Sequence, residues 1–182
     1  PGDIPLKEWV GEFAPERIQL IPLIEDKPSL LAADQIVEEY VRGKELSYQR
    51  VFLARSDPAM AYGSASAVLL IKMALSRLYR LEQRLGIPIY PIVGFGSAPF
   101  RGNFKPTNVK SRLKGYPSGQ TFTVQSAFKF DYPEEFVKKA IASIKKMPRR
   151  PPILIEDEEP LLALIERISA TYARQVERLT PR

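Results

Sequence analysis

Short apolar segments alternate with longer amphipathic ones along this chain, and this alternation limits the possible fold more than any other feature. The clearest unit is VFLARSDPAMAYGSAS, residues 51–66, in which an apolar run over residues 51–54 ends in an Arg-Ser-Asp turn. A loop of small residues follows, and a long segment of helical periodicity begins at Ala65. This order is typical of a buried strand, a polar turn and a helix.

The same pattern recurs along the chain and predicts four strands, at residues 17–24, 51–54, 87–93 and 121–125. Helices are expected at residues 28–42, 65–85, 133–147 and 160–179, with a weaker helical stretch at 107–114 and a short strand or tether at 153–155. Strands that alternate with helices form parallel sheets. We therefore expect an α/β fold that is part of a (β/α)8 barrel.

A doubly wound sheet is the alternative fold. Its dinucleotide-binding version needs a glycine fingerprint, whereas Gly94-Phe95-Gly96 lacks the third glycine and the helix that should follow. Residues 1–147 would carry the βα units and the active-site face, and residues 148–182 a proline-rich break and a final helix of the same domain. Because the chain begins with Pro1 and not with Met, we expect a segment of a longer protein.

The composition excludes several kinds of chemistry. The chain has no histidine and no cysteine, so a metal ion would have to be a hard one held by oxygens, such as magnesium or manganese. The net charge of +6 favours an anionic partner. The paired cations at residues 145–146 and 149–150 are interpreted as a solvated face. No apolar run is long enough to span a membrane, and we expect a cytoplasmic protein.

Polar side chains follow each predicted strand, and in a parallel sheet these turns meet at one edge. They include Glu25 and Asp26, then Arg55, Ser56 and Asp57, then Ser97 and Arg101, and finally Gln125 with Lys129 beyond it. Two carboxylates at neighbouring strand ends, Glu25 and Asp57, could hold a magnesium ion. Arg55 and Arg101 could bind phosphate or carboxylate groups through their guanidinium forks.

Each of these residues also has an ordinary structural interpretation. Glu25 and Asp26 suit the N-terminus of the next helix, and Asp57 before Pro58 suits a turn. Arg101 and Lys129 would be at home in solvent, and Gln125 at a strand end. Only the recurrence of the pattern at four strands favours a functional site.

Four stretches of this sequence resemble the archaeal-type phosphoenolpyruvate carboxylases. They are IPLIED (21–26), ARSDPAMAYG (54–63), GFGSAPFRGNF (94–104) and YPSGQTFTVQSAFKFDYP (116–133). The resemblance implies a barrel enzyme that joins bicarbonate to phosphoenolpyruvate, gives oxaloacetate and phosphate, and needs Mg²⁺ or Mn²⁺. It also implies a homo-oligomer, specifically a tetramer. Phosphate would pass first to bicarbonate, and the enolate of pyruvate would then attack the carbon dioxide released from carboxyphosphate.

The resemblance also assigns roles to single residues. Glu25 and Asp57 look like the two metal carboxylates, and Arg101 like an arginine of the glycine-rich loop. Gln125 resembles the family's glutamine, while Arg55, Ser97 and Lys129 are further candidates for substrate binding, and Arg55 and Arg101 for catalysis.

This sequence departs from the pattern of the larger bacterial and plant enzymes at two positions. Phe95 and Met60 stand where those enzymes carry cations, and Arg55 is one candidate to replace them. The family's essential histidine precedes the part of the protein seen here, so we expect the chain alone to be inactive.

Three other functions remain open at this point. Another phosphoenolpyruvate or pyruvate barrel, such as a lyase or aldolase, would use the same carboxylates but would not need bicarbonate. A basic nucleic-acid-binding module is less favoured, because the aromatic residues fall mostly on periodic apolar faces, so no nucleic acid is expected. The helix over residues 160–179 could also serve as an assembly piece of a larger protein.

Overall fold

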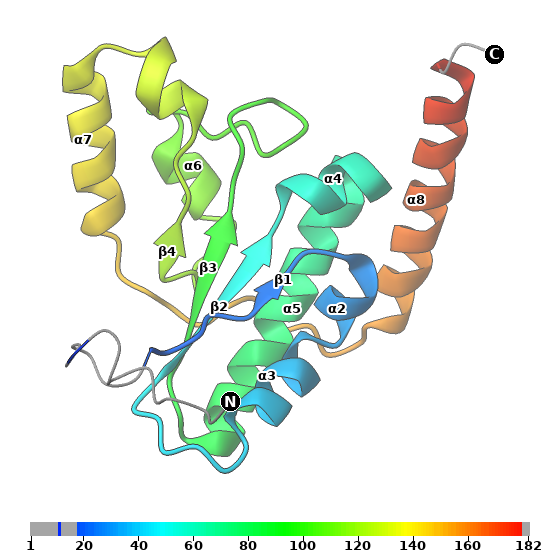
Figure 1. The fold of residues 1–182 in the computed structure, drawn as a ribbon. Coiled ribbons are helices and arrows are strands. Elements are labelled where there is room, and N and C mark those ends of the chain that lie inside the picture. The colour runs from blue at the N-terminus through cyan, green and yellow to red at the C-terminus, as the bar shows by residue number, and fades with distance from the viewer. Residues whose placement is uncertain (1–10, 12–17, 180–182) are drawn as a thin grey trace.

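The computed structural model describes residue 11 and residues 18–179, and a four-stranded parallel sheet lies at its centre (Figure 1). The strands are β1 (Leu23–Ile24), β2 (Gln49–Ala54), β3 (Ile89–Gly94) and β4 (Thr121–Phe122), and they lie side by side in chain order. Among the described strands the order never reverses, as it would in a doubly wound sheet. The α/β class is confirmed. The four strands form an open sheet, so the complete barrel stays a prediction.

The two faces of the sheet differ in how far they are covered. In the parallel register one row of facing residues is buried, and it consists of Ile24, Leu53, Val93 and Phe122. The next row points to the opposite face, since side chains alternate along a strand. It comprises Leu23, Phe52, Ile92 and Thr121, of which Leu23 is 58% exposed. Helices therefore cover one face, and the other is apolar and partly open.

Eight helices connect and follow the strands in the described part of the chain. They are α2 (Lys27–Leu31), α3 (Ala33–Val41), α4 (Ser56–Tyr62), α5 (Ser64–Leu85), α6 (Val109–Leu113), the π-helix η1 (Ala127–Asp131), α7 (Glu134–Lys145) and α8 (Glu159–Leu179). Helix α5 lies behind β1 and β2 in Figure 1 and packs on α2, α3 and α8. Its buried side chains form the largest part of the core. Gly86, with φ +66°, ends this helix in the left-handed conformation that glycine adopts without strain.

Several elements differ from those predicted. The strand expected at 17–24 is reduced to β1, with residue 17 outside the described residues, and β4 ends at Phe122. The helix expected at 28–42 is divided into α2 and α3 at Ala32. Helix α4 occupies residues for which a loop was predicted. It tolerates Pro58 because this proline lies in the first turn, where the missing N–H has no intrahelical partner.

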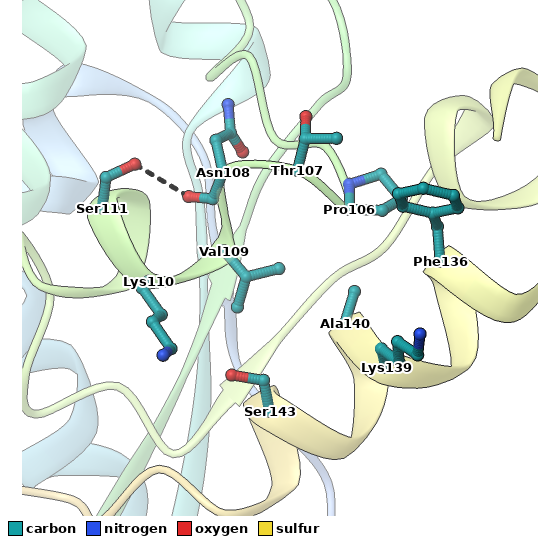
Figure 2. A pocket seen from close by; sticks show the side chains of 10 residues that line it. All are labelled: Pro106, Thr107, Asn108, Val109, Lys110, Ser111, Phe136, Lys139, Ala140 and Ser143. Carbon is teal, nitrogen blue, oxygen red and sulfur yellow. Dashed lines mark hydrogen bonds between the residues drawn. The ribbon is translucent and has the colours of Figure 1, made fainter.

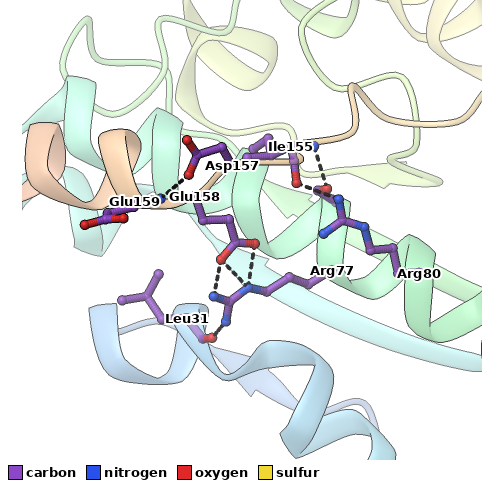
Figure 3. A network of polar contacts seen from close by, with 8 residues as sticks. Leu31, Arg77, Arg80, Ile155, Asp157, Glu158 and Glu159 are labelled. Carbon is purple, nitrogen blue, oxygen red and sulfur yellow. Dashed lines mark hydrogen bonds and ion pairs between the residues drawn. The ribbon is translucent and has the colours of Figure 1, made fainter.

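Polar contacts fasten the segment before α8 to α5 (Figure 3). Arg77 on α5 donates to both carboxylate oxygens of Glu158 and to the carbonyl of Leu31, and Arg80 donates to the carbonyl of Ile155. Ile155 N–H in turn donates to Ser76 Oγ at 3.0 Å. Residues 153–155 therefore form a tether and no strand.

Arg149 also contributes to this attachment, at the amino end of β3. Its guanidinium donates to Glu82 Oε2 at 2.6 Å and to the Ile89 carbonyl at 2.8 Å, and it lies over the Tyr90 ring. The interpretation of residues 149–150 as a solvated face is therefore wrong for Arg149. No helix in the described part of the chain is long and apolar enough to cross a membrane.

Candidate active site

Two acidic residues follow β1, and they have different surroundings. Asp26 caps α2, and its Oδ1 accepts a hydrogen bond from the Ser29 N–H at 2.7 Å. This backbone hydrogen bond, helped by the Ser29 side chain, lowers the pKa of Asp26. Asp26 therefore has a structural role, as helix-capping residues commonly do. Glu25 is exposed and makes no such cap, so it is the carboxylate available for a ligand.

Asp57 lies in the first turn of α4, directly beyond β2. Its side chain is 61% exposed, and its Oδ1 is 3.6 Å from Nη2 of Arg101. Ion pairs that are this open to solvent are weak, so the contact leaves the carboxylate accessible. Asp57 and Arg101 come from the ends of two neighbouring strands, β2 and β3, and the fold brings them together as the sequence predicted.

Glu25 and Asp57 line one shallow pocket at the carboxyl ends of β1 and β2. Its remaining lining residues are apolar and come from the open face of the sheet and the segment before it: Ile21, Leu23, Phe52, Ala54 and Ile92. Among the described residues, no group of three or more acidic side chains could hold a metal ion. Magnesium, however, is commonly bound by one or two carboxylates that share it with water and substrate oxygens. The donor set of this pocket fits such an ion.

The loop after β3 is folded back on itself and brings Arg101 beside Asp57. The N–H of Gly96 donates to the Arg101 carbonyl at 2.9 Å, and the N–H of Phe104 donates to the Gly96 carbonyl at 3.1 Å. Gly96 is required for this closure, because a Cβ at this position would lie 2.6 Å from Cβ of Arg101. We call residues 95–104 the glycine loop.

Arg55 lies beneath the glycine loop and is only 5% exposed. Its Nε donates to the hydroxyl of Tyr116 at 3.2 Å, and its guanidinium carbon is 5.7 Å from the centre of the Phe95 ring. A third contact joins its Nη2 to Ser64 Oγ at 3.5 Å. No local pattern marks Tyr116 as a partner of Arg55, since 61 residues separate them in the chain.

The other predicted site residues lie outside the pocket that Glu25 and Asp57 share. Ser97 is nearly buried, and its Oγ accepts a hydrogen bond from the N–H of Ala127 at 2.9 Å. It therefore already joins the glycine loop to η1. Gln125 and Lys129 are exposed around the start of η1. Neither lines the pocket that Glu25 and Asp57 share.

A separate cavity lies between α6 and α7 (Figure 2). It contains none of the predicted site residues, and its lining consists of Pro106, Thr107, Asn108, Val109, Lys110, Ser111, Phe136, Lys139, Ala140 and Ser143. Asn108 links this cavity to the glycine loop, because its Nδ2 donates to the carbonyl of Asn103 at 2.6 Å.

Comparison with known proteins gives a consistent result. The family model described as phosphoenolpyruvate carboxylase matches residues 1–182. A phosphoenolpyruvate carboxylase of Pyrococcus abyssi is 50% identical over 98% of this chain, and one of Methanospirillum hungatei is 49% identical over the same share. One of Caldivirga maquilingensis is 51% identical over 96% of it. The chain spans 37%, 37% and 34% of these relatives, so it corresponds to about a third of their length.

Proposed function

This chain belongs to the archaeal-type phosphoenolpyruvate carboxylase family, and from that premise we propose that it forms the metal- and anion-binding edge of a carboxylating enzyme. The complete protein would convert phosphoenolpyruvate and bicarbonate to oxaloacetate and phosphate. Because the chain spans about a third of its relatives, the remaining catalytic groups would come from other parts of the protein.

One observation carries this proposal: Glu25 and Asp57 line the same pocket, and Arg101 lies beside one of them. The two carboxylates come from the ends of neighbouring parallel strands, where ligands of α/β proteins bind. Had the turns diverged, no single ion could have met both side chains.

Glu25 and Asp57 would hold Mg²⁺ or Mn²⁺, which supplies positive charge to neutralise the enolate oxygen of the substrate. Arg101 can turn from Asp57 toward a phosphate or carboxylate group, because their ion pair is long and exposed. The apolar floor of the pocket offers no competing ligand to the ion, and its exclusion of water would depend on the parts of the protein that cover the open face.

The reaction requires two transfers. The phosphoryl group leaves the enol oxygen of phosphoenolpyruvate for a bicarbonate oxygen, and carboxyphosphate and the pyruvate enolate result. Carboxyphosphate releases carbon dioxide and phosphate, and the enolate carbon then forms the new bond to carbon dioxide. Arg101, with Arg55 behind it, would balance the negative charge that moves between these groups. Substrate contacts by Ser97, Gln125 and Lys129 stay predictions.

We also propose that the four strands are half of a (β/α)8 barrel that the rest of the protein completes. The in-order parallel strands and the open apolar face support this arrangement. The attachment of residues 149–158 to α5 and β3 supports the assignment of residues 148–182 to the same domain. A homotetramer is expected from the family resemblance alone, and the cytoplasmic location stays an expectation from the sequence.

The direct test is the Asp57→Asn variant of the full-length enzyme. Oxaloacetate formation should fall by at least about a hundredfold, because the loss of a metal ligand removes several kcal/mol of charge stabilisation. Binding of Mn²⁺, measured by calorimetry, should weaken in the same variant. Glu177→Gln, on the exposed side of α8, is the matched control that removes a carboxylate elsewhere.

Near-normal activity and metal binding in Asp57→Asn would remove this residue from the site. Turnover of phosphoenolpyruvate by the wild-type enzyme without bicarbonate would instead indicate the lyase or aldolase alternative.

A further inference from the structure

Arg55 is a buried cation without a buried anion. The residue is only 5% exposed, yet no described carboxylate forms an ion pair with it. Its neighbours are a phenol hydroxyl, a serine hydroxyl and an aromatic ring, and all of them are neutral. Burying an unpaired charge is unfavourable, so such an arrangement persists only where other contacts or a ligand compensate for it.

Unpaired polar atoms gather around Arg55 and the glycine loop. Among the described residues, four buried side-chain atoms without a hydrogen-bond partner lie here: Nη1 of Arg55, Oγ of Ser56, Nε of Arg101 and Oδ1 of Asn103. Nη1 of Arg55 is directly beneath Gly102, because a Cβ built on this glycine would lie 2.8 Å from it. The positive charge therefore lies immediately under the backbone next to Arg101.

Two aromatic residues fix the orientation of this guanidinium. Phe95 presents its ring to it, and Tyr116 packs edge-on against the same ring at a centroid distance of 5.1 Å. Tyr116 is itself nearly buried, and its hydroxyl accepts from Nε. A planar guanidinium held at Nε and stacked on a ring can rotate little, so the direction of Nη1 is set.

We propose that Tyr116 is a positioning residue for substrate binding: its hydroxyl holds Arg55 so that the buried positive charge faces the anion at the glycine loop. This inference rests on the proposed function and adds a residue to it. The charge acts through a thin, dry layer of protein formed by Gly102, where electrostatic interactions are stronger than in water. The negatively charged ligand thus receives a second cation that need not touch it.

The test is Tyr116→Phe in the full-length enzyme. This change removes the acceptor oxygen and keeps the ring that packs on Phe95. We expect the KM for phosphoenolpyruvate to rise about tenfold, as for a lost hydrogen bond to a charged group, while kcat stays within about twofold. The Kd for phosphoenolpyruvate, measured directly by calorimetry, should rise by the same factor. Tyr90→Phe is the control, because Tyr90 lies near the amino end of β3 and the glycine loop follows the carboxyl end. This variant should change neither the KM nor the Kd.

A double-mutant cycle with a variant of Arg55 distinguishes a positioning role of Tyr116 from a role in packing alone. In Arg55→Met the guanidinium and all its donors are lost, so adding Tyr116→Phe should have no further effect on the KM. Equal effects of Tyr116→Phe in both backgrounds would show a structural role and overturn the inference. An unchanged KM and Kd in the single variant would also overturn it. If the wild-type enzyme forms no oxaloacetate, the proposed function fails, and the calorimetric Kd then decides the role of Tyr116 separately.

Discussion

Gly102 occupies a position at which no other residue fits. Its φ of +131° is unfavourable for residues with a side chain, and a Cβ there would lie 2.8 Å from both Nη1 of Arg55 and the ring of Phe95. Gly102→Ala should therefore lower the free energy of unfolding of the full-length protein by about 2 kcal/mol or more and raise the KM for phosphoenolpyruvate. Thermal unfolding and steady-state kinetics measure the two effects.

Gly43→Ala provides the matched comparison. Gly43 also has a positive φ, of +70°, but nothing lies within 4 Å of an added Cβ. Only the backbone strain, about 1 kcal/mol, should appear, and the KM should stay constant. If both variants lost the same free energy of unfolding and kept the same KM, the close approach of Gly102 to Arg55 and Phe95 would contribute nothing to stability or to substrate binding.

At the scale of single residues, the sequence predicted that Glu25 and Asp57 converge, but it did not predict the surroundings of Arg55. The convergence of Glu25 and Asp57 on one pocket could be predicted because strand ends in a parallel sheet converge wherever the strands themselves are recognised. The burial of Arg55 could not be predicted, since its shielding depends on Tyr116 and Phe95, which are distant in sequence. Arg149 was taken for a solvated residue for the same reason, because its partner Glu82 is 67 residues away.

Among the elements, the pair formed by Arg77 and Glu158 contributes to the attachment of α8. The hydrogen bonds from Arg77 lower the pKa of Glu158 below its ordinary value of 4.5. The unfolded chain therefore binds a proton at this carboxylate more readily than the folded one. The stabilisation is complete above about pH 4.5 and is lost as the pH falls through the lower folded-state pKa.

Glu158→Gln should remove about 1 kcal/mol of stability at neutral pH, and the difference from the wild type should shrink below about pH 4.5. Denaturant unfolding at a series of pH values measures this difference. Glu156→Gln is the control, since Glu156 is largely exposed and its ion pair with Arg80 is longer, at 3.5 Å. A difference that stayed constant down to pH 3 would exclude the Arg77 contact as its source.

The positions of most elements could be read from hydrophobic periodicity, and their ends could not. Helices α5 and α8 appear within one residue of the predicted limits because their periodic faces are long. The strand at residues 17–24 was overestimated, because β1 pairs in the described chain with β2 alone and only two residues enter the ladder. Helix α4 was missed because Pro58 and Gly63 are more common in loops.

On the scale of the whole molecule, the open face of the sheet predicts how the chain behaves by itself. Leu23 is largely exposed there, at 58%, and Ile21, which lines the same pocket as Leu23, is 40% exposed. Contiguous apolar surface of this kind marks an interface. The isolated 182-residue chain should therefore bind the dye ANS more strongly than the full-length enzyme does and should form no oxaloacetate. Carboxylation by the isolated chain at the rate of the full enzyme would contradict the assignment of catalytic groups to the remainder.

The α/β class followed from the sequence, whereas closure of the barrel could not be judged from it. Periodicity reports which side of an element is buried but not which partner buries it. The row formed by Leu23, Phe52 and Ile92 is apolar in sequence, and only the arrangement in space reveals that these residues face away from α5.

From β2 onward, each described strand of the sheet pairs with the one that precedes it in the chain. During synthesis, β2 therefore meets β1 already outside the ribosome, and β3 and β4 extend an existing edge in turn. Among the described strands, none has to wait for a later one to be inserted between it and its neighbour. The order of the strands thus permits this part of the protein to be assembled vectorially, at the pace of translation.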